Sequence, residues 1–132
     1  MSTCARAGRP ARATAIAAIA AVLVAMTGCA STIGRYAFLD QSYPERPGNA
    51  SIDVFDTGEP SRPHVRVARI DVHLEKTGFA MSSLAEAVPE LERQARRAGC
   101  DAIIEITERR SEILETRVYH VTAIGVRYLD RP

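Results

Sequence analysis

The sequence predicts a domain of the α+β class: a single sheet of about four strands with one helix packed on one face, in the order ββαββ, after a signal peptide and a tether. Two observations carry this prediction. Apolar and polar residues alternate in segments on both sides of residues 83–99, which is typical of strands, and residues 83–99 have the apolar spacing of an amphipathic helix. Such a helix and such a sheet bury their apolar faces against each other.

Two strands are predicted before the helix. The segment "SIDVFD" alternates briefly, and residues 65–75 follow the turn "GEPSRP" as a longer strand. In the longer strand Val65 and Val67 have one parity, whereas the apolar residues from Ala68 onward have the other. Because a slip of one residue moves every following side chain to the opposite face, we expect a β-bulge near Ala68 or Arg69.

The helix is predicted in the segment "SLAEAVPELERQARRAGC". Its apolar residues are spaced by 4, 3, 4 and 3 positions and form one stripe: Leu84, Val88, Leu91, Ala95 and Ala98. Ser83 and Glu86 have the spacing of a capping box, and Gly99 is expected to end the helix in the left-handed conformation. Pro89 lacks an N–H and clashes with the carbonyl four residues earlier, so we expect a kink or break there, with the regular helix starting at about Pro89.

Two strands are predicted after the helix. The segment "DAIIEIT" predicts the third strand, in which Ile103 and Ile104 belong to the core and Ile104 and Ile106 lie on one side. The segment "ERRSE" predicts a charged turn, and residues 113–128 predict a long final strand that bends at Gly125.

The N-terminal segment has the organisation of a signal peptide. Residues 1–12 contain three arginines and no acidic residue, and residues 13–26 contain no charge. A basic region followed by an apolar region is typical of secretory signals, and the basic end stays on the cytoplasmic side. The uncharged stretch extends to Gly34, so an uncleaved membrane anchor of roughly 22 residues is one alternative. A buried helix of a soluble protein is another.

The residues "MTGC", Met26–Cys29, resemble the lipobox of bacterial lipoproteins, in which Leu, a small residue, and Gly or Ala precede the modified cysteine. Met26 stands in place of the Leu. The resemblance implies that a diacylglyceryl group is attached to the thiol of Cys29 and that the chain is cleaved before it. Ala30, rather than Asp, follows, which resembles the signal for transfer to the outer membrane in a host with two membranes.

Three parts of the chain are therefore expected: a lipoprotein signal peptide at residues 1–28, a lipidated N-terminus and flexible tether at 29–49, and a small α+β domain at 50–132. The prolines and glycine that precede residue 49 are typical of loops. An alternative to a free tether is that its large apolar side chains dock on the domain or on the membrane surface: Tyr36, Phe38, Leu39 and Tyr43. The expected location is the cell envelope, at the outer membrane and facing the periplasm.

The charge of the chain argues against a nucleic-acid partner, and its cysteine count argues against an intramolecular disulfide. The full chain has 17 basic and 16 acidic side chains, and removal of the three leader arginines leaves 14 against 16. Proteins that bind nucleic acids carry a basic excess on one face, so no nucleic-acid partner is expected. With Cys4 in the leader and Cys29 modified, Cys100 has no partner for an intramolecular disulfide. We expect a buried core residue; pairing between chains and a reactive thiol are the alternatives.

The segments "AGCDAII", residues 98–104, and "AIGVRY", residues 123–128, resemble a motif of the YbjQ-like and RcsF-like families. The resemblance covers about residues 52–128 and implies the same type of small β-sheet domain. RcsF-like proteins are disulfide-linked, and this chain has too few cysteines for that arrangement. Some YbjQ-like domains are described as heavy-metal binders and resemble ring oligomers, so the resemblance also implies a homo-oligomer as one possibility.

No catalytic residue and no cofactor are predicted. The candidates for a metal site are His73 and His120, which lie on predicted strands, with Asp71 or Glu75 beside them. Zinc sites use three or four ligands at defined spacing, so no metal site is predicted from this pair. The carboxylates Glu105 and Glu108 are a candidate acid–base pair, but charges at such positions in a strand are ordinary solvent-facing residues.

The sequence thus predicts an envelope lipoprotein of non-enzymatic type. It is expected to act through protein contacts as an accessory, structural or stress-linked component, with the membrane lipid bound through Cys29 and an envelope protein as partner. The alternative is a small-ligand or metal-binding, ring-forming YbjQ-like module, and an enzyme is third.

Overall fold

The computed structural model describes residues 29–78 and 81–131. The expected signal peptide, residues 1–28, lies outside the described residues. Within the part of the chain that is described, no helix combines the length and the apolar character that a bilayer crossing requires.

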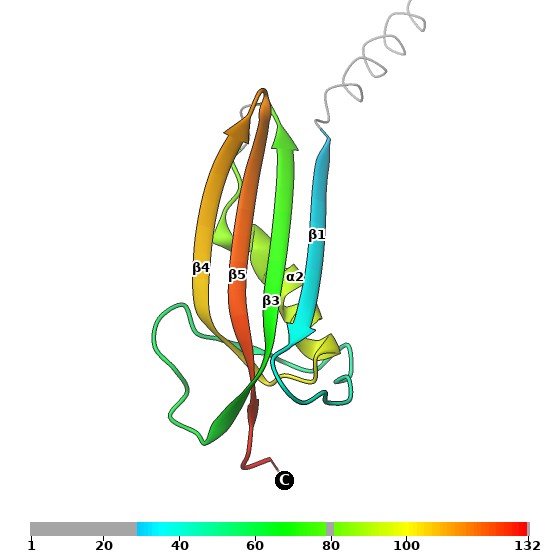
Figure 1. The fold of residues 1–132 in the computed structure, drawn as a ribbon, viewed down its shortest axis with the longest axis vertical. Coiled ribbons are helices and arrows are strands. Elements are labelled where there is room, and N and C mark those ends of the chain that lie inside the picture. Colours follow the sequence, from blue (N-terminus) through cyan, green and yellow to red (C-terminus); the bar gives the residue numbers. More distant parts are fainter. Residues whose placement is uncertain (1–28, 79–80, 132) are drawn as a thin grey trace, which may run out of the picture.

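Across these described residues, five strands and one helix form two layers (Figure 1). The elements are β1 (Ala30–Phe38), β2 (Asp53–Val54), β3 (His64–Thr77), α2 (Leu84–Arg97), β4 (Ala102–Ile113) and β5 (Thr116–Tyr128). The strand order is β1-β3-β5-β4-β2, and β2 is parallel to β4 whereas the other neighbours are antiparallel. The α+β prediction, with one helix on one face of a single sheet, is confirmed; the sheet has one strand more than expected.

The additional strand comes from the segment that was expected to be a flexible tether. That prediction is wrong for β1, which pairs with β3 along its whole length, from Ala30 opposite Lys76 to Phe38 opposite Ala68. The physical reason is aromatic packing on the helix side of the sheet. Tyr36 and Tyr43 pack against the buried core, and the ring centroids of Tyr36 and Phe38 lie 5.4 Å apart in an edge-to-face arrangement. Of the alternatives for this segment, docking on the domain is therefore the one that applies to Tyr36 and Tyr43.

The expected bulge in β3 is confirmed. The register between β3 and β5 shifts between Arg66 and Ala68. Val67 and Ala68 are consequently both buried, at 1% and 0% exposure, although they are neighbours in a strand. From Ala68 onward one parity of β3 faces α2 and the other faces away from it.

The helix α2 starts at Leu84, so the expected break at Pro89 is wrong. Pro89 is exposed and lies in the second turn, where it leaves only the carbonyl of Ala85, near the open end of the helix, without its N–H donor. The capping box is also wrong. Ser83 stands at the N-cap without a side-chain capping bond, and the carboxylate of Glu86 pairs instead with Lys76 on β3.

The C-terminal end of the helix follows the prediction. Gly99 has a φ of +77°, and the buried stripe of α2 includes Leu91 and Ala95. A side chain at Gly99 would also collide with the carbonyl oxygen of Pro44, 2.6 Å from the added Cβ. Glycine is therefore required at position 99 for two reasons: the left-handed backbone conformation of the turn and the close approach of the segment before β2.

The strand β4 differs from its prediction in two ways. The segment "ERRSE" was expected to be a turn, but it lies within β4, and the turn to β5 consists of Leu114 and Glu115. The pairing with β5 shifts between Ile104 and Thr107, at Glu105, whose φ is +52°. This bulge places Ile104 and Ile106 in different apolar clusters, so the expectation that they share one side is wrong.

The core lies between α2 and the sheet. It includes Ile103, as expected, while Ile104 is buried in a smaller cluster with Val126. At its centre the chain after α2 comes very close to β5: a Cβ on Gly125 would lie 2.5 Å from the Sγ of Cys100. Gly125 is therefore needed for space.

A buried carboxylate joins the ends of several elements beside this core. Asp101, 4% exposed, accepts a hydrogen bond of 2.8 Å from the backbone N–H of Tyr128 and forms an ion pair with Arg46. Arg131 Nε lies 3.6 Å from the same carboxylate. The segment before β2, the start of β4 and the end of β5 are thus held at one point.

The close approach at Gly125 yields a stability prediction. Gly125→Ala should lower the free energy of unfolding by about 1–3 kcal/mol, because the added methyl group overpacks the space filled by Cys100. Urea unfolding of the unlipidated protein measures this change. Gly48→Ala is the matched control, since an added Cβ there has nothing within 4 Å, and its effect should stay within about 0.5 kcal/mol.

The cause is tested by shortening the opposing side chain. In a Cys100→Ala background the Gly125→Ala cost should fall, because the two positions are coupled through direct contact. An unchanged cost in that background would show that the Sγ contact is not the reason for glycine at position 125.

Candidate functional site

The candidate site is the face of the sheet that α2 leaves uncovered. On β3 the buried residues Ile70, Val72 and Leu74 point toward the helix side, so the residues between them point the other way. Cross-strand partners lie on the same face. We call the uncovered residues around the centre of the sheet the open face: Ile33, Arg35, Arg69, Asp71, His73, Thr107, Arg109, His120 and Thr122.

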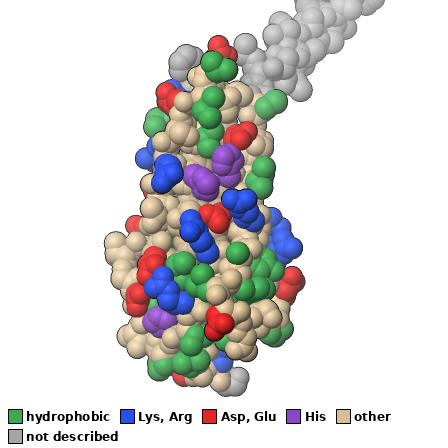
Figure 2. Space-filling model, in the orientation of Figure 1, with side chains coloured by type: hydrophobic (Ala, Val, Ile, Leu, Met, Phe, Trp, Pro, Cys, Tyr) green, Lys and Arg blue, Asp and Glu red, His purple; other side chains and the backbone are tan. Residues whose placement is uncertain are grey.

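Two histidines lie side by side on the open face (Figure 2). His73 and His120 are direct partners in the β3–β5 register, and their ring centroids are 5.4 Å apart. His73 Nε2 lies 2.8 Å from Glu75 Oε1, and His120 Nε2 lies 3.9 Å from Asp71 Oδ1. The structure therefore brings together the four residues that the sequence analysis considered for a two-histidine site.

This arrangement does not form a metal centre as it stands. Across residues 29–78 and 81–131, no group of three or more His, Cys, Asp or Glu side chains converges to hold a metal ion. The third described histidine, His64, lies elsewhere, with its Nδ1 2.8 Å from the carbonyl oxygen of Arg62. Two imidazoles alone fall short of the three or four ligands that zinc sites use.

Three arginines give the open face its positive charge. Arg35, Arg69 and Arg109 come from β1, β3 and β4 and line, with Asp71, a shallow depression of about 480 Å³. Arg69 Nε lies 3.7 Å from Asp71 Oδ1. Among the described residues, Arg35 and Arg109 have no carboxylate within 4.0 Å. The depression is thus lined by three guanidinium groups and one carboxylate.

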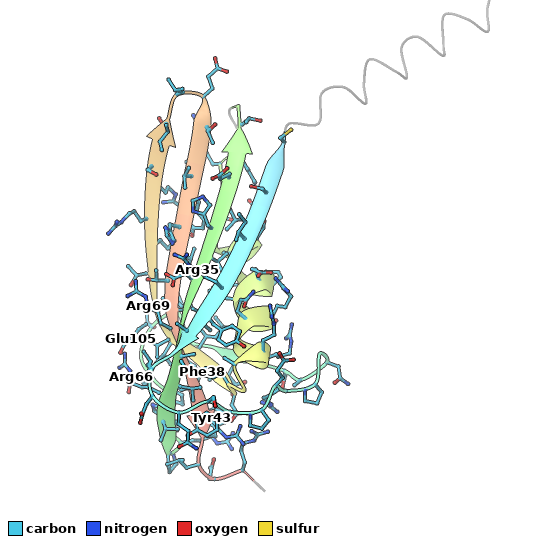
Figure 3. The ribbon with its side chains drawn as sticks, turned by 45° about the vertical axis from the view of Figure 1, so that its right-hand side comes forward. Arg35, Phe38, Tyr43, Arg66, Arg69 and Glu105 are labelled. Atoms are coloured by element: carbon cyan, nitrogen blue, oxygen red, sulfur yellow. The ribbon has the colours of Figure 1, made fainter. Side chains whose placement is uncertain are left out.

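The depression has the chemistry of a site for anionic groups. A guanidinium presents donors in a planar fork that matches a carboxylate or a phosphate, and Arg35 and Arg109 have these donors available. Figure 3 shows Arg35 and Arg69 on the neighbouring strands β1 and β3, with the arginine Arg66 lower on the sheet. Arg66 differs from them because both of its terminal nitrogens lie 2.6 Å from the oxygens of Glu105.

The candidate acid–base pair Glu105 and Glu108 is not brought together by the structure. Hydrogen bonds from Arg66 lower the pKa of Glu105, which keeps this carboxylate ionised. Glu108 lies beyond the bulge, with Oε2 3.9 Å from Arg110 Nη2. Each carboxylate has its own arginine, which is the arrangement of a charged surface.

The two described cysteines have different environments. Cys29 is exposed and immediately precedes β1, and its carbonyl oxygen accepts a hydrogen bond of 3.4 Å from the N–H of Thr77. Cys100 is buried, as expected, and burial raises its pKa from an ordinary value of 9.0 to about 12. A thiol that is both inaccessible and protonated is inert.

Sequence reasoning missed the arginines of the open face. Arg35 lies in the segment interpreted as a tether, and Arg109 lies in the segment interpreted as a turn. The available signal for the strand of Arg35 was the alternation of residues 33, 35 and 37 with residues 34 and 36. Because this segment contains few large apolar residues, the alternation does not stand out as a strand pattern. His73 and His120, by contrast, were candidates from the sequence because both lie on predicted strands, and the structure pairs these strands.

No protein-family model matches the sequence, and no curated protein matches it. A solved structure that is similar is the Francisella virulence factor FvfA in an orthorhombic crystal form. It shares 14% sequence identity with this chain, with a TM-score of 0.47, and the match covers 70% of this chain and 97% of the FvfA chain.

The buried thiol predicts a pH dependence of stability. The thiol of the unfolded chain ionises near its ordinary pKa of 9.0, whereas the folded thiol stays protonated up to about 12. The folded state therefore binds more protons between these values, and stability present below pH 9 is lost as the pH rises toward 12, by up to about 1.4 kcal/mol per pH unit. Urea unfolding of a Cys29→Ser protein at about pH 8 and about pH 10.5 measures the loss.

A double variant provides the control. Cys29→Ser/Cys100→Ala should lose less stability over the same interval, while Tyr119 and Tyr128, whose pKa values burial raises to about 12, contribute equally to both proteins. Equal pH slopes in the two proteins would contradict the inert, buried thiol.

Proposed function

We propose that this protein is a bacterial envelope lipoprotein without catalytic activity, held at a membrane by acyl chains on Cys29, whose domain binds a protein partner through the open face. The observation that carries the proposal is the charge of that face. Arg35, Arg69 and Arg109 line one depression together with the carboxylate of Asp71, and two of the three have no acidic partner among the described residues.

The anchor is supported by the lipobox pattern and by the position of Cys29. Its side chain is exposed at the end of the sheet, where a thiol is accessible to an acyl-transfer enzyme. Each buried CH₂ group of an acyl chain contributes roughly 0.8 kcal/mol, and two or more chains give stable attachment. Outer-membrane attachment facing the periplasm is part of the proposal and rests on Ala30 in the position after the cysteine.

The partner is proposed to be an envelope protein that presents carboxylates. An acidic surface complements three arginines and offers carboxylates that their guanidinium groups can bind with two parallel hydrogen bonds. Ile33, 61% exposed, and the partly buried Ile124 lie on the same face as these arginines and add apolar surface for the contact. A mixture of arginine and apolar side chains is typical of the centres of protein interfaces.

The runner-up is a small-ligand or metal-binding module, and the observation that favours it is the adjacency of His73 and His120. The carboxylates of Asp71 and Glu75 accompany the two rings. A ring-forming homo-oligomer belongs to this second candidate function.

The proposed function is tested in two steps on the full-length chain in its bacterial host. Mass spectrometry of the purified protein should find a new N-terminus at Cys29 carrying the mass of acyl chains, and Cys29→Ser should abolish both the acyl mass and the cleavage that creates this N-terminus. A photo-crosslinking amino acid at Thr122, on the open face, should then capture a protein partner. Arg35→Glu/Arg109→Glu should reduce that yield by about tenfold or more, because like charges oppose each other at the contact.

A position on the helix provides the matched control. The same crosslinker placed at Glu92, on α2, should capture the partner much less efficiently than the crosslinker at Thr122. Separately, the charge reversal Arg93→Glu on the exposed side of α2 should leave the yield from Thr122 unchanged. Capture that is equally efficient from both faces, or that survives the charge reversal on the open face, would contradict the proposed interface.

The metal-binding candidate has its own test. The purified Cys29→Ser protein is incubated with zinc, dialysed and analysed for metal content, beside His73→Ala and His120→Ala variants. Stoichiometric zinc that is lost in both variants would support this candidate. Because only two imidazoles converge, we expect no stoichiometric metal, and that result would remove the metal-binding function.

A further inference from the structure

Exposed apolar side chains gather at one end of the sheet. Leu114, in the turn between β4 and β5, is 99% exposed, and its neighbour Ile113 is 65% exposed. Met81, which follows β3 in the chain and lines a small hollow beside Ser111 and Glu112, is 68% exposed. Single exposed apolar residues are ordinary, but a cluster at one tip indicates a contact.

Cys29 lies at the same end of the sheet. The N–H of Thr77 donates to the carbonyl of Cys29, Thr77 is the register partner of Thr116, and Thr116 is the partner of Ile113. These four residues form one row across the sheet, and three steps between strands separate Cys29 from Ile113 by about 14 Å. Figure 1 shows the start of β1 and the β4–β5 turn at this common end.

The turn itself is unusual for a soluble hairpin. Leu114 has a φ of +57°, a conformation that two-residue hairpins normally assign to Gly, Asn or Asp. A large apolar side chain here combines backbone strain with full exposure, and nothing in the described domain packs against it. Backbone strain of this kind clusters at functional positions.

The charges around the tip are compatible with a lipid surface. Glu112 pairs with Arg117, with 3.3 Å between Oε1 and Nε, and Lys76 pairs with Glu86. Glu115, beside Leu114, is exposed, and a carboxylate at this position suits the headgroup region better than the hydrocarbon core.

We propose that the β4–β5 turn is a second membrane contact, in which Leu114, with Ile113 and Met81, enters the headgroup region of the leaflet that holds the acyl chains of Cys29. This inference rests on the proposed lipid anchor. The anchor already places the tip at the lipid surface, so a weak apolar contact is enough to fix the orientation of the domain. The strands then stand upright on the membrane, and the open face points sideways.

The chain contains no tryptophan, which allows a direct test. Leu114→Trp is prepared in the full-length lipidated protein and reconstituted in vesicles of phosphatidylethanolamine and phosphatidylglycerol. The emission of the new indole should shift to the blue relative to the same substitution in the unlipidated Cys29→Ser protein in buffer, and lipids brominated near the headgroup should quench it. The matched control is Leu129→Trp, because Leu129 is 62% exposed just after β5, at the opposite end of the sheet.

In the control protein the indole should keep the emission of a solvated side chain and remain open to acrylamide. A second variant avoids any effect of the bulky indole. Leu114→Gly, which accepts the positive φ without strain, should keep the fold, while vesicle binding of the Cys29→Ser protein falls by about fivefold or more relative to the same protein with Leu114.

The outcomes separate this inference from the proposed function. If the protein floats with vesicles through its acyl chains but the indole at position 114 is as solvated as the one at position 129, the membrane contact is wrong and the anchor stands. A blue shift without quenching by brominated lipid would mean that protein covers the tip, and it would also overturn the inference. A chain that carries no lipid at Cys29 would overturn both.

Discussion

The carboxylate of Asp101 is the interaction on which the arrangement of this domain depends. It lies almost fully buried at the start of β4, and a buried charge is tolerated only when it is paired and hydrogen-bonded. Arg46, the N–H of Tyr128 and Arg131 meet this requirement: Arg46 comes from the segment before β2, whereas Tyr128 and Arg131 come from the end of β5 and the residues after it. The backbone N–H of Arg46 also donates to the carbonyl of Arg96 at the end of α2. Helix, sheet and the segment after β1 are thereby locked together, and the strands that carry the open face keep one geometry.

Within this frame, two bulges determine what each face of the sheet presents. The bulge at Val67 brings the rest of β3 into a phase in which apolar residues meet α2 and Asp71 and His73 face away. The bulge at Glu105 does the same for β4, so that Arg109 becomes the partner of His120. Without these shifts, the charged residues of one strand would oppose the core residues of the next. The charge of the open face is therefore a consequence of local backbone irregularity as much as of composition.

Much of the fold could be predicted because its strongest signals are local. The apolar stripe of α2, Gly99 at its end and the change of parity at Val67 each have a direct physical cause in the sequence. β1 could not be predicted, because its pairing depends on β3 and its helix-facing positions include Gly34 instead of a large apolar residue. The sequence placed His73 and His120 on two predicted strands, but only the pairing of β3 with β5 makes them direct partners, and the site around Arg35 required β1 as well.

The short connection between Cys29 and the folded domain limits the distance from the membrane at which the proposed partner could bind. Residues 30–38 are bonded into β1, so the folded domain begins directly after Cys29, the proposed site of lipid attachment. The strand β5, with 13 residues, extends about 44 Å. With the proposed lipid anchor at Cys29, a partner of these arginines must come within that height of the bilayer, so it must project from the same membrane or lie against it.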